Sequence, residues 1–219
     1  MKNKKTAIVI GATGLIGKEL VKLLINDSDF DCIKVFVRRS MGIANTKIEE
    51  HIIDFNELTS IKENIVGDVL FSTLGTTIKQ AGSKDAQYLV DYTYQYEIAK
   101  IAADNGVKDY YLVSSSGANS KSNIFYTRMK GELDNSVCQL PFKRIRIFRP
   151  SLLLGERGEK RLGESIGSKL IKIIEFIPYL KKYRGIEGHV VALAMIKSFK
   201  EENDSSPVFY ELDSIFDLI

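Results

Sequence analysis

The chain is poor in the residues that build metal centres and disulfide frameworks. Its 219 residues include two cysteines, two histidines and no tryptophan. Cys32 and Cys138 lie far apart and outside any CxxC spacing, so two packed thiols in a reducing compartment are the simplest interpretation. His51 and His189 have no partners at ligand spacing. We therefore expect no metal site.

Long apolar runs and an excess of one charge are also missing. No apolar run reaches the roughly 18 to 20 residues that span a bilayer, and no signal-peptide core precedes the first strand. The 31 basic and 28 acidic residues are interspersed, so the net charge of +3 forms no stripe for a nucleic acid. These absences predict a cytoplasmic protein that binds a small-molecule substrate, with neither a nucleic acid nor a membrane as partner.

What the chain does have is an alternation of strand-length apolar runs with longer helical patterns, which is typical of a parallel sheet covered by helices. Residues 6–10 (TAIVI) are apolar on both faces, as in a buried central strand. Further strands are predicted at residues 33–37, 48–53, 68–72, 109–113, 143–148 and 208–212, and helices at 14–26, 85–105, 124–137, 165–176 and 188–199. The predicted fold class is α/β, a doubly wound and mostly parallel sheet (Rossmann fold). Residues 1–219 would form one domain, with 155–219 as a small helical and strand extension on the substrate side.

A glycine-rich turn, GATGLIG, joins the first strand to the first helix. Gly11 would permit the tight turn, Gly14 would let the backbone approach a pyrophosphate, and Gly17 would let the helix pack close to the sheet. The free N–H groups and positive dipole of a helix N-terminus suit phosphate. Such turns also occur without a ligand, but the position between a buried strand and an amphipathic helix predicts dinucleotide binding.

The end of the second strand bears on which dinucleotide is bound. NAD sites usually place Asp or Glu there, whereas this chain has Arg38 and Arg39. Guanidinium groups pair well with a 2′-phosphate, so the two arginines favour NADP(H) over NAD(H). The alternative is two solvated loop arginines. Asp54, after the third strand, could contact the adenine amine or could be an ordinary exposed strand-end aspartate.

A candidate catalytic group lies in the second half of the chain. Tyr126 and Lys130 are four residues apart in a predicted helix and therefore share a face. The ammonium of Lys130 would favour the phenolate form of Tyr126, so that the tyrosine could exchange a proton with a substrate oxygen. Ser114, Ser115 and Ser116 end the fifth strand, at the sheet edge where ligands bind. One of them, with Ser115 favoured, could hydrogen-bond a substrate carbonyl; turn capping is the alternative.

Together the segments GATGLIG, VRRS, FSTLGTT, LVSSSGA, YTRMK and FRPSLLLG resemble an atypical short-chain dehydrogenase/reductase. The likeness covers about residues 6–199 and is greatest to the Tat-interacting-protein-oxidoreductase branch, which is NAD-dependent epimerase/dehydratase-like. It implies an NADP(H)-dependent oxidoreductase acting on a small carbonyl or alcohol, with Tyr126 and Lys130 as the catalytic pair. It also implies cofactor contacts from Thr13, Gly14, Leu15 and Ile16 at the pyrophosphate, Leu74 and Gly75 at the adenine ribose and nicotinamide side, Lys130 at the nicotinamide ribose, Leu153 by the nicotinamide, and Arg161.

The chain departs from this family pattern in two places. The asparagine that many such reductases carry in the helix before the fifth strand has no clear counterpart in residues 90–94. The C-terminal part is short compared with sugar-nucleotide epimerases, which argues against a bulky nucleotide-sugar substrate. Two other functions stay open, an NADPH-binding regulator with little catalysis and a nucleotide-sugar epimerase or dehydratase. The helices at 85–105 and 124–137 could pair two copies into a homodimer or could simply face the core.

Overall fold

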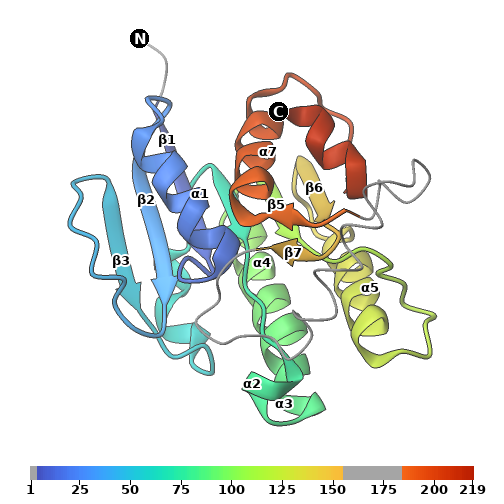
Figure 1. Ribbon diagram of the computed structural model, residues 1–219. Helices are drawn as coiled ribbons and strands as arrows, with labels where there is room; N and C mark the ends of the chain where they lie inside the picture. Colours follow the sequence, from blue (N-terminus) through green and yellow to red (C-terminus); the bar gives the residue numbers. More distant parts are fainter. Residues whose placement is uncertain (1–3, 155–183) are drawn as a thin grey trace.

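A seven-stranded parallel sheet forms the centre of the molecule (Figure 1). The computed structural model describes residues 4–154 and 184–219. The strands lie in the order β3-β2-β1-β4-β5-β6-β9, and each neighbouring pair is parallel. Their bounds are β1 Lys5–Ile10, β2 Phe30–Val37, β3 Ile48–Ile52, β4 Val69–Ser72, β5 Asp109–Val113, β6 Arg144–Arg149 and β9 Val208–Glu211. The predicted doubly wound, mostly parallel fold is confirmed.

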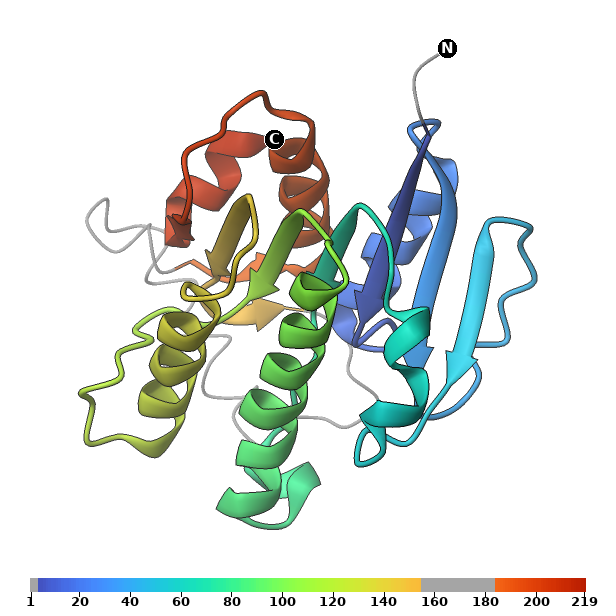
Figure 2. The same ribbon diagram turned by 180° about the vertical axis from the view of Figure 1, so that it is seen from behind.

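Helices cover both faces of the sheet (Figures 1 and 2). One face packs against α1 (Leu15–Asn26) and α7 (Gly188–Lys200), and the other against α4 (Tyr94–Asp104) and α5 (Phe125–Val137). Because side chains alternate along a strand, β1 supplies Ala7 and Val9 to the first core and Ile8 and Ile10 to the second. This explains why its sequence is apolar without interruption.

The strand order positions the functional site. β1 lies beside β4, although β2 and β3 come between them in the chain. The connections therefore run in one direction across the sheet from β1 and in the other from β4. A crevice opens at the carboxyl ends of two strands where the direction changes, and ligands bind there in folds of this kind. The segments that follow β1, β4, β5 and β6 meet at this edge.

Several elements differ from those that periodicity predicts. The predicted helix at 85–105 consists of α3 (Lys84–Tyr88), a π-helical turn (Leu89–Thr93) and α4. β2 begins earlier than predicted, at Phe30. The sequence does not predict the short helix α2 (Ile78–Ala81), the 3₁₀ turns at Leu58–Asn64 and Leu212–Leu218, or the small sheet of β7 (Leu153–Leu154) and β8 (Ile186–Glu187). The predicted helix at 165–176 lies outside the described residues.

The last part of the chain joins the main body. β9 extends the sheet beside β6, and α7 packs against α1. In the described ranges no helix has the length and apolar character needed to cross a lipid bilayer. Across the same residues, no three His, Cys, Asp or Glu side chains come together in a group that could hold a metal ion.

Candidate functional site

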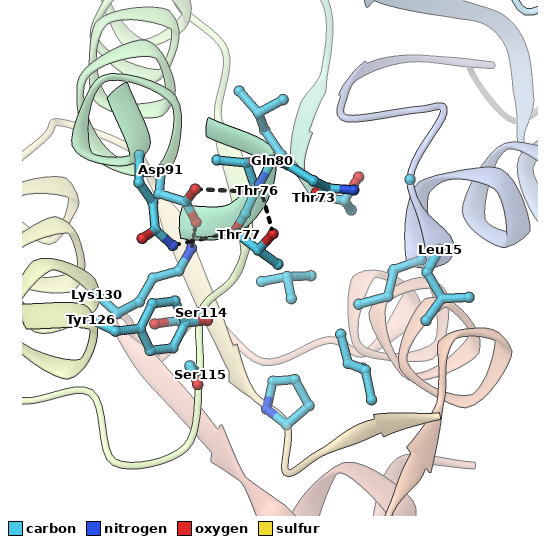
Figure 3. A pocket seen from close by; sticks show the side chains of 18 of the residues that line it. Leu15, Thr73, Thr76, Thr77, Gln80, Asp91, Ser114, Ser115, Tyr126 and Lys130 are labelled. Carbon is cyan, nitrogen blue, oxygen red and sulfur yellow. Dashed lines mark hydrogen bonds and ion pairs between the residues drawn. The ribbon is translucent and has the colours of Figure 1, made fainter. Parts of the chain in front are cut away.

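A cleft of about 1070 Å³ lies at the carboxyl edge of the sheet (Figure 3). Its walls come from the segments after β1, β4, β5 and β6, and from the start of α5. A smaller cavity of about 100 Å³ lies against the end of β2. Both cavities are lined by Thr13, Gly14, Thr73, Leu74 and Gly75, so they adjoin across the glycine-rich turn.

The glycine-rich turn is folded as its spacing predicts. Gly11 has a φ of +78°, and a Cβ there would lie 2.4 Å from the carbonyl carbon of Thr73. A Cβ at Gly17 would lie 2.1 Å from the carbonyl oxygen of Gly11. Gly14 is the N-cap residue of α1, so no side chain hydrogen-bonds to the N–H groups at the start of the helix. The first turn of α1 carries no acidic residue. The N-terminus of α1 is therefore open to an anion such as a phosphate, and the residues present fit a dinucleotide.

Tyr126 and Lys130 share one wall of the cleft (Figure 3). Tyr126 is 38% exposed, whereas Lys130 is 3% exposed. The ammonium of Lys130 lies 3.1 Å from Oδ1 of Asp91, which is itself buried. Burial lowers the pKa of Lys130, but the attraction of Asp91, joined by that of Tyr126, outweighs it, so the pKa lies above its ordinary value. Lys130 is therefore a charged group in a largely dry wall of the cleft.

Asp91 is the residue of this site that sequence reasoning missed. It stands in the π-helical turn, within the residues 90–94 where the family asparagine has no counterpart. Its Oδ2 accepts the N–H of Thr76 at 2.8 Å. A cue does exist in the sequence, because Gln87, Asp91 and Gln95 are spaced by four and place polar groups on a helix face that is otherwise expected to be apolar.

The three serines follow β5 and all line the cleft. The main-chain N–H groups of Ser114 and Ser116 bind the carbonyls of Phe148 and Pro150, at 2.7 and 3.0 Å, which fixes the segment against β6. Ser114 is buried, while Ser115 and Ser116 are partly exposed. The Ser115 hydroxyl donates to the Ser116 carbonyl at 3.4 Å, a weak contact that a ligand could replace.

Most of the predicted cofactor residues face one of the two cavities. Those that line the larger cleft are Thr13, Gly14, Leu15, Ile16, Leu74, Gly75, Lys130 and Leu153. Gly11 and Arg38 line the smaller cavity, together with Phe36 and Phe55. The structure thus brings the two ends of the predicted dinucleotide site into adjoining spaces.

The remaining predicted residues lie elsewhere. Gly17 is buried beneath the turn, and Arg39 is exposed and lines neither cavity. Asp54 also lines neither, and its carboxylate accepts the backbone and side-chain N–H groups of Asn56, each at 2.9 Å. Asp54 is exposed, and its contact with an adenine amine stays a prediction. Arg161 lies outside the described residues.

Comparisons with known proteins identify the family of the chain. Residues 11–136 match a family described as NAD(P)H-binding. A relative in Meyerozyma guilliermondii, "Protein FMP52, mitochondrial", is 33% identical over 211 residues, which cover 95% of this chain and 86% of that protein. "Protein HTATIP2" of Rattus norvegicus is 35% identical over 173 residues, which cover 77% and 71%. The enzyme WbmH of Bordetella bronchiseptica, solved with NAD+, aligns with a TM-score of 0.72 at 12% identity, over 95% of this chain and 75% of that one, and shows the fold alone.

The cytoplasmic location predicted from the sequence is contradicted by these relatives. FMP52 proteins from several yeasts, at 33 to 37% identity, are named as mitochondrial. The prediction rested on the lack of a secretory signal core and of a membrane span. Neither absence separates the cytoplasm from mitochondria, because mitochondrial targeting uses amphipathic, arginine-rich signals instead.

The family match spans more than half of the chain, and both relatives exceed 30% identity over most of it. The resemblance to atypical short-chain dehydrogenase/reductases that the motifs indicate is confirmed. The chain therefore belongs to the NAD(P)H-binding Rossmann family that includes the FMP52 and HTATIP2 proteins.

Proposed function

We propose that the protein is an NADP(H)-dependent oxidoreductase that interconverts a small carbonyl compound and its alcohol. The observation that carries this proposal is the position of Tyr126, Lys130 and Ser115 along one cleft that begins at the glycine-rich turn. The match to an NAD(P)H-binding family supports the class of cofactor.

The two cavities suit the two ends of such a cofactor. The pyrophosphate would lie against the turn, where the N-terminus of α1 offers main-chain N–H groups and a positive dipole. In the smaller cavity, Phe36 and Phe55 provide flat apolar walls for an adenine, and Arg38 provides a guanidinium for a 2′-phosphate. The nicotinamide end would extend along the larger cleft toward Lys130 and Leu153.

The chain's own residues would handle the proton and orient the substrate. The bound cofactor would supply or accept a hydride. Tyr126 would give a proton to the carbonyl oxygen during reduction and take it from the alcohol in the reverse reaction. The Ser115 hydroxyl would donate a hydrogen bond to the same oxygen. The ammonium of Lys130 would donate to the ribose hydroxyls of the cofactor.

Replacing Arg38 by alanine is expected to remove the preference for NADPH. The loss of a charge-assisted hydrogen bond, worth about 1.5 to 3 kcal/mol, should weaken NADPH binding at least about tenfold and leave NADH binding little changed. Titration with each nucleotide, followed by nicotinamide fluorescence, measures the ratio. Arg39→Ala is the matched control, because Arg39 lines neither cavity and should affect the ratio less. A wild-type protein that prefers NADH would contradict the assignment.

A screen of aldehydes, ketones and quinones with NADPH then tests the reaction. Turnover of a carbonyl substrate supports the oxidoreductase. Tight NADPH binding without turnover of any of them would instead favour an NADPH-binding regulator. A nucleotide-sugar epimerase would require tightly held NAD that copurifies and an absorbance change on adding the nucleotide sugar.

A further inference from the structure

A polar stripe is buried on the helical run from α3 to α4, where an apolar face is expected. Gln87, Asp91 and Gln95 are nearly inaccessible to solvent. The amide of Gln95 donates to the main-chain carbonyl of Asp91 at 2.7 Å and accepts the Ser72 hydroxyl at 2.7 Å. Buried polar groups of this kind cost free energy unless each is paired, and here hydrogen bonds hold the backbone around Asp91.

The carboxylate of Asp91 joins two walls of the cleft (Figure 3). One oxygen lies 3.1 Å from the ammonium of Lys130 on α5, and the other accepts the N–H of Thr76 at 2.8 Å in the segment after β4. The carbonyl of Thr76 accepts an N–H from Gln87 at 3.3 Å. The Thr76 backbone is therefore held from both sides by residues of the stripe. The π-helical turn that carries Asp91 is a feature often found at functional sites.

Asp91 is also the carboxylate in direct contact with Lys130. On α5 itself, Tyr126 and Asp134 face the ammonium, but Asp134 is paired with Arg149 of β6 at 2.9 Å. Among residues 4–154 and 184–219, the other charged groups that line the cleft are Lys18, Lys84 and Glu19, and Glu19 is paired with Lys22 at 2.7 Å. A lysine that is buried without a counter-ion tends to lose its proton. The charge of Lys130 therefore depends chiefly on Asp91.

We propose that Asp91 is a positioning residue of this site, which keeps Lys130 protonated and fixes its ammonium relative to the Thr76 backbone. The use of that ammonium in holding a cofactor rests on the function proposed above. The coupling between the two side chains is a property of the chain alone, so it can be measured without turnover.

The Asp91→Asn variant tests this coupling. Asparagine keeps a carbonyl that can accept the Thr76 N–H but removes the charge. Protein labelled with ¹³C-lysine is titrated by NMR, and the Lys130 signal is assigned with Lys130→Arg. We expect the wild-type Lys130 amine to titrate above about 10.4, the ordinary lysine value, and the variant amine at least about one pH unit below wild type. Asp85→Asn, an exposed carboxylate of α3, is the matched control and should leave the titration unchanged.

Cofactor affinity gives a second readout. NADPH affinity should begin to fall at a lower pH in Asp91→Asn than in the wild type, because the amine of the variant loses its charge at least about one pH unit earlier. Lys130 titrating at the same pH in the variant and the wild type would overturn the proposal. A wild type that binds no NADPH would contradict the proposed function, while the lysine titration would still decide the role of Asp91.

A second pair of variants covers the case in which Asp91→Asn does not fold. Lys130→Met leaves a carboxylate buried without its partner, which is strongly destabilising, whereas Lys130→Met with Asp91→Asn removes both charges. The double variant should therefore melt several degrees above Lys130→Met. A double variant that melts below Lys130→Met would show that the two side chains do not act as a pair.

Discussion

Replacing Tyr126 by phenylalanine is expected to lower turnover by about 10²- to 10⁴-fold, the usual contribution of a positioned acid–base group, with NADPH affinity nearly unchanged. In the proposed reaction the phenol exchanges a proton with a substrate oxygen, and the ring faces the cleft from the first turn of α5. Because Tyr126 is more than a third exposed, the loss of its hydroxyl should cost little stability. Absorbance of NADPH with the best substrate of the carbonyl screen measures the rate.

Tyr88→Phe is the matched control for this experiment. Tyr88 lies on α3 and donates to the Glu132 carboxylate at 3.2 Å. Burial, together with the nearby Glu132, raises the pKa of Tyr88 to about 12, so this phenol does not exchange protons near neutral pH. Its loss should leave turnover near the wild-type value. Substantial turnover in Tyr126→Phe would rule out the proposed mechanism, even if cofactor binding were as expected.

The fold could be predicted closely because a doubly wound sheet shows itself in local patterns. A strand buried on both faces, such as β1 or β5, is a short apolar run between turn residues, and its bounds follow from that run. The glycine-rich turn is equally local, since its glycines are required by contacts with residues near in sequence or at the end of the adjacent β4. Such features need no knowledge of how distant segments pack.

The environment of Lys130 could not be predicted, because it depends on packing between elements. Helical periodicity places Tyr126 and Lys130 on one face but does not identify what faces them. The partner, Asp91, lies in another helical run, and the π-helical turn shifts the side chains after it relative to a regular helix. Residues 90–94 contain no asparagine to match the family pattern, and yet the Asp91 carboxylate contacts Lys130 from this turn.

The two arginines illustrate the same limit on a smaller scale. Arg38 and Arg39 are adjacent, chemically identical and both exposed, so sequence alone treats them as one pair. Only the geometry at the end of β2 separates them, because Arg38 lines the smaller cavity and Arg39 does not. Both arginines lie in the bend that follows β2, outside the regular strand, so strand alternation does not predict which of the two reaches the cavity.

Replacing Gly17 by alanine is expected to lower the free energy of unfolding by at least about 3 kcal/mol, at the upper end of what overpacking costs. The new methyl group would lie 2.1 Å from the Gly11 carbonyl oxygen and 2.8 Å from the Cα of Ala12. Both contacts are with backbone, so no change of rotamer relieves them. Either α1 must move away from the sheet or the turn must open, and both changes disturb the proposed pyrophosphate site. NADPH binding should therefore weaken together with stability.

The direction of the change in stability distinguishes Gly17 from an ordinary helix glycine. In an ordinary helix interior, glycine to alanine stabilises a protein by about 0.4 to 1 kcal/mol, because it restricts the unfolded chain and favours the helix. Gly42→Ala is the control, since a Cβ there meets nothing within 4 Å and its φ of +66° should cost about 1 kcal/mol. Denaturant unfolding and NADPH titration of both variants separate the outcomes. If Gly17→Ala is more stable than the wild type, α1 does not pack against the glycine-rich turn at the distances given above. If the variant is destabilised but keeps full NADPH affinity, the cofactor does not bind at this turn.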